Sequence, residues 1–135
     1  MKSRDGTFVE AQLRAELDRC AYCATKPCQA ACPADCSPAD FIMAARVGEA
    51  ADYRRAAELI LGANPLGGVC GAVCPDTFCM AACTRRRVDG AINIPAVQAT
   101  IVRRGRAAGL SRAAAPAWNG RTVAVIGAGP AGLAA

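Results

Sequence analysis

The chain has 135 residues, a formal net charge of +5 at neutral pH, and a hydrophobic share of 53%. That share overstates the core, because 32 residues are alanine and only 25 are leucine, isoleucine, valine or phenylalanine. Ordering each residue costs about 1–2 kcal/mol of backbone entropy, so this composition predicts a fold that needs metal or covalent cross-links. The charged N-terminus does not resemble a signal peptide, and the longest uncharged run, 59–75, is not expected to form a membrane-spanning helix.

Three short helices are expected in the first half of the chain. Val9, Leu13 and Leu17 recur every four residues, which predicts one apolar stripe on a helix that ends before the first cysteine. Ser37-Pro38 suits the N-cap and first position of a helix over 38–47. A third helix is expected over 50–61. The apolar side of this helix would consist of Tyr53, Ala57 and Ile60. The residues expected to stop it are Gly62, Asn64 and Pro65.

The chain contains nine cysteines and no histidine, and the cysteines fall into two bursts. The first burst consists of Cys20, Cys23, Cys28, Cys32 and Cys36, and the second of Cys70, Cys74, Cys79 and Cys83. Such short spacings let several thiolates converge on one centre, and the pairs four residues apart in the second burst fit single helical turns. Each burst contains a Cys-Pro pair, and in bacterial cluster motifs the cysteine before proline binds the second cluster. The pattern therefore predicts two iron–sulfur clusters with ligands exchanged between the bursts.

Other chemistries use cysteine clusters too. Small secreted domains pair their cysteines as disulfides, and zinc sites favour two C-x2-C knuckles, often with histidine. This chain has only one C-x2-C and no histidine. A zinc-organised interaction module and a domain of free, redox-sensing thiols nevertheless stay open as alternatives. Unpaired metal-binding thiols predict a reducing, cytoplasmic setting.

After the second burst, Pro95 is expected to open a helix that runs to about Arg104 and buries Val97, Ile101 and Val102. Residues 105–120 are rich in Ala, Gly, Arg and Pro and are interpreted as a linker. The stretch 84–112 carries seven arginines and one acidic residue, a net charge of +6, but no aromatic residue. Nucleic-acid binding is therefore not expected. A solvated basic face that balances anionic clusters, or a docking face for an acidic partner, is expected instead.

The last residues carry a second motif. Residues 121–126 are expected to form a short β-branched strand, followed by a glycine-rich turn and an alanine-rich helix. This arrangement is the dinucleotide-binding fingerprint. The candidate binding residues are Gly127, Ala128, Gly129, Pro130, Ala131 and Gly132. Because the acidic residue that binds ribose is expected about 20 residues further on, we interpret the chain as the N-terminal piece of a larger flavoprotein.

Five motifs in order resemble one family. They are C-A-Y-C-A-T-K-P-C-Q-A-A-C-P, N-P-L-G-G-V-C-G-A-V-C-P, C-M-A-A-C-T-R, I-N-I-P-A-V-Q and V-A-V-I-G-A-G-P-A-G-L. Together they are similar to the N-terminal di-cluster domain, and the entry into the FAD domain, of dihydropyrimidine dehydrogenases and glutamate synthase small subunits. The resemblance implies a mainly α, ferredoxin-like iron–sulfur domain over 1–104, a linker over 105–120, and over 121–135 the first strand and turn of a truncated Rossmann-type FAD domain.

The resemblance also implies two 4Fe–4S ligand sets. Cys20, Cys23, Cys28 and Cys83 would hold one cluster, and Cys32, Cys74, Cys79 and Gln98 the other. Gln98 is assigned by the resemblance alone, since its position on the expected helix gives no sign of a metal ligand. Cys36 is expected to be a small buried side chain, and Cys70 is not expected to be a ligand. The spacing between Cys74 and Cys79 is one residue shorter than is common in the pyrimidine enzymes.

Electron transfer is the activity that the resemblance implies. The whole protein would use NAD(P)H and FAD, and the two clusters would relay electrons between the flavin and a catalytic partner subunit or domain. No catalytic acid or base is expected in these residues, and neither nucleic acid nor a membrane is an expected partner. Cys70, the N-P-L-G segment and Gln98 favour the NAD-dependent dihydropyrimidine dehydrogenase branch. Glutamate synthase small subunits and related flavin-linked subunits are the alternative.

Overall fold

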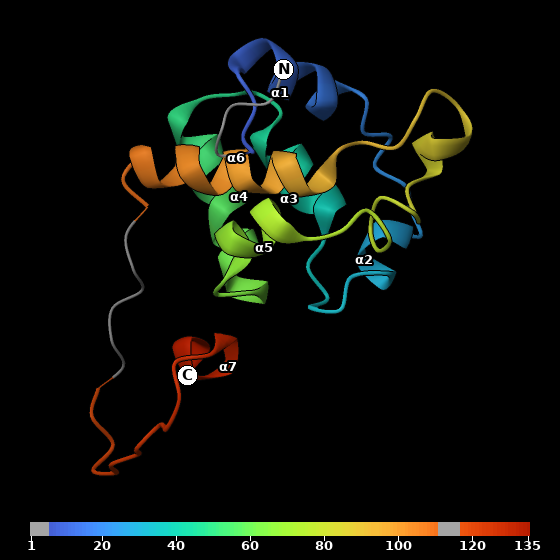
Figure 1. Ribbon diagram of the computed structural model, residues 1–135. Coiled ribbons are helices and arrows are strands. Elements are labelled where there is room, and N and C mark those ends of the chain that lie inside the picture. Colours follow the sequence, from blue (N-terminus) through green and yellow to red (C-terminus); the bar gives the residue numbers. More distant parts are fainter. Residues whose placement is uncertain (1–5, 111–116) are drawn as a thin grey trace.

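The computed structural model describes residues 6–110 and 117–135. Residues 6–110 form a helical body in which loops carry most of the cysteines (Figure 1). Its elements are α1 (Glu10–Asp18), α2 (Pro27–Ala30), α3 (Pro38–Ala45), α4 (Ala50–Ala63), α5 (Gly67–Val73), the 3₁₀ turn η1 (Thr84–Arg87) and α6 (Ile94–Ala107). The short helix α7 (Pro130–Ala134) follows in the C-terminal segment. The prediction of a mainly helical protein is confirmed.

Helix α6 is the centre of the body, and it packs against both α4 and α5 (Figure 1). Val97, Ile101 and Val102 are buried as predicted. Thr100 is also fully buried, which its polar side chain did not predict. Its hydroxyl donates to the Ala96 carbonyl at 2.6 Å and accepts the Phe8 amide at 2.9 Å. The buried hydroxyl therefore has a partner both as donor and as acceptor, and the second bond links the N-terminal segment to α6.

Helix α1 contributes Leu13 and Leu17 to the core, as its four-residue spacing predicted. Val9 does not belong to this stripe, since it is the N-cap of the helix and its side chain is 57% exposed. Phe8 is buried in its place. A residue at the N-cap lies outside the helical repeat, so its side chain need not follow the helix face.

The other helix ends also differ from the predictions by a few residues. Helix α3 begins at Pro38 but ends at Ala45, and α4 continues through Gly62 to Ala63, with Asn64 as its C-cap. Gly62 therefore does not stop the helix. A glycine in a helix interior costs about 1 kcal/mol, which the burial of Tyr53, Ala57 and Ile60 outweighs.

Helix α6 runs past the predicted boundary near Arg104. Gly105, assigned to the linker by composition, is buried where α6 crosses α4, and a Cβ there would lie 2.5 Å from that of Ala57. The helix ends at Ala107; Gly109, beyond the C-cap, has a positive φ of 82°, and the Leu110 amide bonds back to the Gly105 carbonyl at 2.9 Å. This is a Schellman ending, the usual glycine-dependent stop of a helix. The helical body thus extends to Leu110.

Residues 117–135 contain α7 but no strand among those described. Residues 121–126 have no regular secondary structure, and Val123 and Ile126 are 81% and 100% exposed. A strand takes its hydrogen bonds from a neighbouring strand, and the described residues offer none to this segment. The turn of the fingerprint does form: Gly127 has a φ of 116°, and Gly132 packs against the Gly127 carbonyl too closely for a Cβ.

Within residues 6–110 and 117–135, no single helix has both the length and the apolar composition needed to cross a membrane. Helices α4 and α5 meet these two criteria only when they are taken together, and a bend of 89° separates them.

Candidate metal centre

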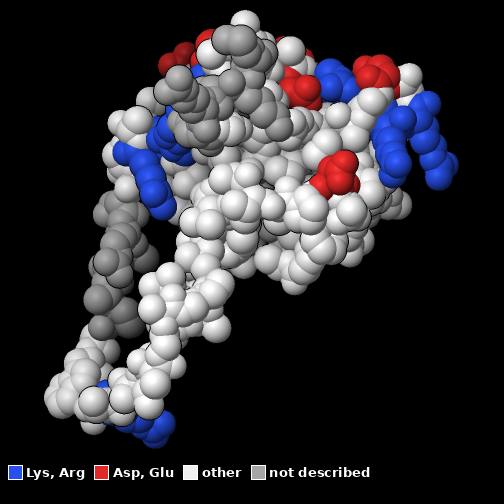
Figure 2. Space-filling view, viewed as in Figure 1, with Lys and Arg blue, Asp and Glu red and all other residues white. Residues whose placement is uncertain are grey.

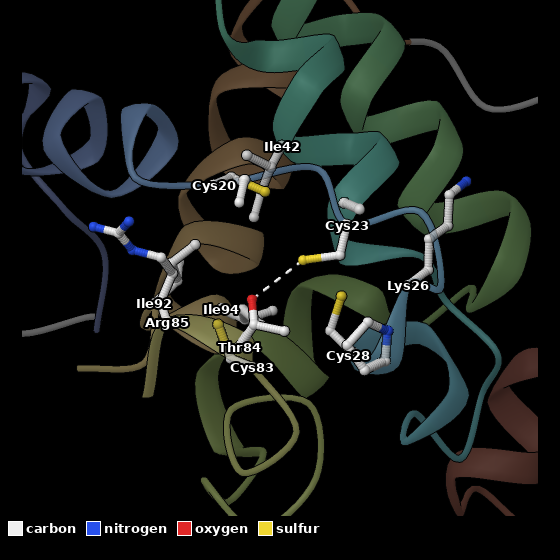
Figure 3. A pocket seen from close by; sticks show the side chains of 13 residues that line it. Cys20, Cys23, Lys26, Cys28, Ile42, Cys83, Thr84, Arg85, Ile92 and Ile94 are labelled. Carbon is white, nitrogen blue, oxygen red and sulfur yellow. Dashed lines mark hydrogen bonds between the residues drawn. The ribbon is translucent and has the colours of Figure 1, made fainter. Parts of the chain in front are cut away.

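Four cysteines from the two bursts line a single pocket. Figure 3 shows the sulfur atoms of Cys20, Cys23, Cys28 and Cys83 around a common space. The remainder of the lining is mostly apolar and comes from α3, the segment before α6, and the first cysteine loop. It includes Ala21, Pro27, Ala39, Ile42, Ile92 and Ile94. The structure therefore brings together the whole of the first predicted ligand set, across some 60 residues of sequence.

The loop that carries three of these cysteines is shaped by unusual backbone angles. Tyr22 and Lys26 both have left-handed conformations, with φ of 47° and 43°. Such angles are uncommon for residues with side chains. Asp40 on α3 fixes both residues, since it accepts hydrogen bonds from the Tyr22 hydroxyl at 3.1 Å and the Lys26 ammonium at 2.7 Å. Strained residues persist where the surrounding structure holds them and tend to cluster at functional sites.

The electrostatic environment of the pocket suits an anion. Lys26 and Arg85 line it, whereas no carboxylate does. Burial raises the pKa of the Cys20 and Cys28 thiols, so binding as thiolates requires a strongly attracting metal nearby. Thiolates around iron and sulfide form an anionic group, which no lining carboxylate repels, although Lys26 and Arg85 are themselves paired with Asp40 and Asp89. The first cysteine set thus fits an iron–sulfur cluster.

The arrangement of the sulfurs also bears on the size of the group. Among the described residues, no three Cys, Asp or Glu side chains are close enough to share one metal ion. A single zinc ion would need thiolates at about 2.3 Å from one point. The four sulfurs line one pocket but do not converge on such a point.

A fifth residue at this pocket contacts the sulfur of a predicted ligand. The Thr84 hydroxyl lies 3.2 Å from the Cys23 sulfur, a distance at which the two form a hydrogen bond (Figure 3). Thr84 is the first residue of η1 and follows Cys83 directly. Nothing in the sequence pattern distinguished this threonine, because its contact with Cys23 spans 61 residues.

The cysteines of the second predicted set lie near one another but do not share such a pocket. The pKa of Cys79 is raised to about 11, first by burial and then by the thiols of Cys32 and Cys74. Burial, Cys70 and Cys32 raise the pKa of Cys74. Cys32 and Cys79 are half-buried, whereas Cys74 is exposed and lines a groove beside α5 and α6. These three thiols therefore interact electrostatically across the two bursts.

Gln98, the fourth member of the second set, is half-buried on α6 and faces α5. Its side-chain amide donates a hydrogen bond of 2.6 Å to the Gly67 carbonyl. This bond uses the amide nitrogen and leaves the oxygen Oε1 as the atom that could meet a metal. The contacts of Gln98 thus orient its amide without joining it to the three thiols.

The two remaining cysteines differ from the predicted ligands. Cys36 is 3% exposed within the core, as predicted, and burial raises the pKa of its thiol to about 12. Cys70 on α5 accepts a hydrogen bond of 3.1 Å from the Asn64 amide. All nine cysteines are free, which agrees with metal-binding or redox thiols rather than with disulfides.

Three arginines of the basic stretch, Arg85, Arg86 and Arg87, lie beside the first cysteine set. In Figure 2 basic and acidic side chains lie side by side along the edge where Figure 1 places η1. Asp89 forms ion pairs with Arg85 and Arg19. Arg86 and Arg87 are exposed and line a groove that also includes Cys83 and Thr84. This basic face is therefore partly neutralised and partly open to solvent.

Comparison with known proteins agrees with this geometry. The family model for dihydropyrimidine dehydrogenase domain II, 4Fe–4S cluster, matches residues 1–110. The NAD-dependent dihydropyrimidine dehydrogenase subunit PreT of Escherichia coli K12 is 38% identical over 121 residues, 89% of this chain and 29% of the relative. The glutamate synthase [NADPH] small chain of the same organism is 36% identical over 129 residues, 94% of this chain and 27% of the relative. A putative oxidoreductase from that strain, UacF, is 38% identical over 87% of this chain and 18% of its own length.

The chain thus spans less than a third of the length of these relatives. The family model, in contrast, covers most of the chain and all four cysteines of the shared pocket. On these grounds the chain belongs to the dihydropyrimidine dehydrogenase domain II family of 4Fe–4S proteins.

Proposed function

We propose that this chain is the electron-transfer part of an NAD(P)H- and FAD-dependent oxidoreductase and that it holds two 4Fe–4S clusters. The observation that carries the proposal is the pocket in which Cys20, Cys23 and Cys28 meet Cys83. When bound, such clusters supply reversible one-electron transfer. The chain contributes thiolate ligands and an apolar wall that limits water.

The second cluster is supported by the proximity of Cys32, Cys74 and Cys79. Two of these cysteines, Cys32 and Cys74, precede proline, the position that binds the second cluster in bacterial motifs. We propose that Gln98 is the fourth ligand, through Oε1, with its nitrogen held by the Gly67 carbonyl. A neutral amide in place of a thiolate makes the bound group one charge less negative, which favours its reduction.

The remainder of the proposed function concerns the whole protein. The Gly127 turn and the start of α7 reproduce the beginning of a dinucleotide-binding motif, and the names of the relatives include NAD and NADPH. We therefore propose that this segment begins an FAD domain and that a catalytic partner subunit or domain exchanges electrons with the clusters. Nine free thiols favour a reducing, cytoplasmic setting.

We assign the chain to the NAD-dependent dihydropyrimidine dehydrogenase type rather than to the glutamate synthase type. Gln98 and Cys70 support this choice, because both resemble residues of the pyrimidine enzymes. The alternative is supported by the sequence identity to a glutamate synthase small chain, which at 36% is similar to the 38% identity to PreT. A zinc-organised interaction module is a candidate of another class, which metal analysis separates from both.

The test is metal analysis of anaerobically prepared chain. Wild-type protein should contain about eight irons and eight acid-labile sulfides per chain, the content of two 4Fe–4S clusters. The variant Cys83→Ala should lose about half of both, because it removes one ligand of the shared pocket. Cys36→Ala is the matched control and should keep the wild-type content, since Cys36 lies in the core.

Stoichiometric zinc without iron would overturn the electron-transfer proposal in favour of the zinc module. Full iron content in Cys83→Ala would overturn the exchange of ligands between the bursts. Equal losses in the two variants would show that the iron depends on the stability of the fold and not on the assigned ligand.

A further inference from the structure

The contact between Thr84 and Cys23 joins the two cysteine bursts through a side chain that is not itself a predicted ligand. The oxygen and the sulfur lie 3.2 Å apart, within hydrogen-bonding distance for a sulfur atom. Figure 3 shows the Thr84 hydroxyl directed into the space between the sulfurs of Cys23, Cys28 and Cys83. Both Thr84 and Cys23 line the same pocket.

The direction of this hydrogen bond follows from the chemistry of the ligand. A cysteine that binds iron does so as a thiolate and has no proton to donate. The threonine hydroxyl can donate as well as accept. With the cluster in place, the hydroxyl must therefore donate its proton to the Cys23 sulfur.

We propose that Thr84 raises the reduction potential of the cluster held by Cys20, Cys23, Cys28 and Cys83, by donating a hydrogen bond to the Cys23 thiolate. This inference rests on the proposed function, because it requires a cluster at that pocket. Reduction adds negative charge, and part of that charge resides on the ligand sulfurs. A donor at one sulfur stabilises the reduced form more than the oxidised form.

The position of Thr84 determines which substitution tests the proposal. The hydrogen bond lies at the exposed side of the pocket, so a water molecule could replace a deleted hydroxyl. Valine has the shape of threonine and would remove the donor while still covering the sulfur. Alanine would leave room for water, so Thr84→Ala should give a smaller change in the same direction.

The experiment is a redox titration of the full chain followed by electron paramagnetic resonance. The signal of the relevant cluster is the one that Cys83→Ala abolishes. In Thr84→Val we expect a lower potential, with about a three- to tenfold smaller ratio of reduced to oxidised cluster at a fixed applied potential, the scale of one hydrogen bond. Thr84→Ser keeps the hydroxyl and should restore the wild-type value.

Thr25→Val is the matched control. Thr25 is exposed in the same cysteine loop and lines the groove beside Thr84, but within the described residues it forms no hydrogen bond with a sulfur of the kind that Thr84 forms. Its replacement makes the same chemical change nearby and should leave the potential unchanged. Iron content is measured in every variant.

An unchanged potential in Thr84→Val with full iron content would overturn the role of Thr84 and leave the proposed function intact. Equal shifts in Thr84→Val and Thr25→Val would also overturn it, since a general change at the rim would then explain the effect. If Thr84→Val loses its iron, the reduction potential is measured in Thr84→Ala instead. A potential equal to that of wild type then overturns the proposal, and a lower potential supports it. Wild-type protein without iron would overturn the proposed function and this inference together.

Discussion

Asp40 shows how one residue outside the cysteine motifs supports the site. Its carboxylate accepts hydrogen bonds from Tyr22 and Lys26, the two left-handed residues of the first cysteine loop. Because Asp40 belongs to α3, its hydrogen bonds hold a loop with little regular structure against a packed helix. The orientation of Cys20, Cys23 and Cys28 therefore depends on a residue that binds no metal.

Replacing Asp40 by asparagine should weaken this support. Asparagine can still accept a hydrogen bond from Tyr22 but has no charge to hold Lys26, so the loop should open more often. We expect iron release to a chelator at neutral pH to become about twofold faster, the modest effect of a partly exposed ion pair. Asp52→Asn is the control, because Asp52 pairs with Arg55 within α4. Equal rates in the two variants would contradict a specific role for Asp40.

The same ion pair has a defined pH dependence. The hydrogen bond from Lys26 lowers the pKa of Asp40 in the folded protein below its ordinary value. A lowered folded-state pKa contributes stability that is complete above the unfolded pKa, about 3.9, and is lost as the pH falls through the folded value. The thermal midpoint should therefore fall less steeply below pH 4 in Asp40→Asn than in wild type.

Around the shared pocket, the sequence pattern marked the cysteines but not the residues that reach them through distant contacts. The cysteine spacing marked every thiol that lines the shared pocket. Asp40 and Thr84 act on this loop through contacts that span between 14 and 61 residues. No periodicity or motif reports such pairs, because they are created by the packing of α3 and η1 against the loop.

At the level of elements, the packing of α5 against α6 depends on a missing side chain. Gly71 is buried, and a Cβ at this position would lie 2.6 Å from the Ala99 amide nitrogen and 3.0 Å from the Pro95 carbonyl. Both neighbours are backbone atoms of α6, which cannot rotate away. The close approach places Cys70 and Cys74, at the middle and end of α5, beside the core helix.

Gly71→Ala should therefore separate the two helices. We expect a loss of about 1–3 kcal/mol in the free energy of unfolding, the usual cost of overpacking, together with reduced iron at the second cysteine set. The measurements are chemical denaturation and iron content. Gly62→Ala is the control: Gly62 lies inside α4 with open space around it, so alanine should stabilise the helix by up to about 1 kcal/mol. Similar effects of both substitutions would contradict the close-approach argument.

The accuracy of the predicted elements follows the strength of their local signals. The helices with clear apolar spacing, α1, α4 and α6, were found at nearly the expected positions. The Cys74 amide donates to the Cys70 carbonyl, four residues back, which is the predicted helical turn. The Cys83 amide instead donates to the Met80 carbonyl, three residues back. The segment around Cys79 forms turns instead of an α-helix. The strand over 121–126 could not form from local propensity alone, because a strand requires a partner.

On the scale of the whole molecule, the helical core and the cysteine loops are distinct in composition. The largest buried side chains, among them Phe41, Leu13, Ile60 and Ile101, belong to α1, α3, α4 and α6. The cysteine loops carry few large apolar residues, and their half-buried thiols pack against the edge of this core. Metal binding should therefore stabilise mainly the loops.

Removal of iron by an anaerobic chelator should produce a local change. We expect faster amide hydrogen exchange in residues 20–36 and 74–92, with protection retained in α4 and α6, because local stability follows local burial. Hydrogen exchange with mass spectrometry, before and after chelation, measures both regions in one sample. Uniform loss of protection would show that the core cannot stay folded without the metal.

The pocket formed by both bursts has a consequence for protein synthesis. A ribosome releases Cys20, Cys23 and Cys28 long before Cys83, and α6, against which the other helices pack, is made after all nine cysteines. Until Cys83 is made, a nascent chain therefore holds only three of the four thiols of this pocket. Thiol ligands alone do not discriminate well among soft and borderline metals. A metal group that needs all four cysteines of this pocket would therefore be completed only after Cys83 has been made.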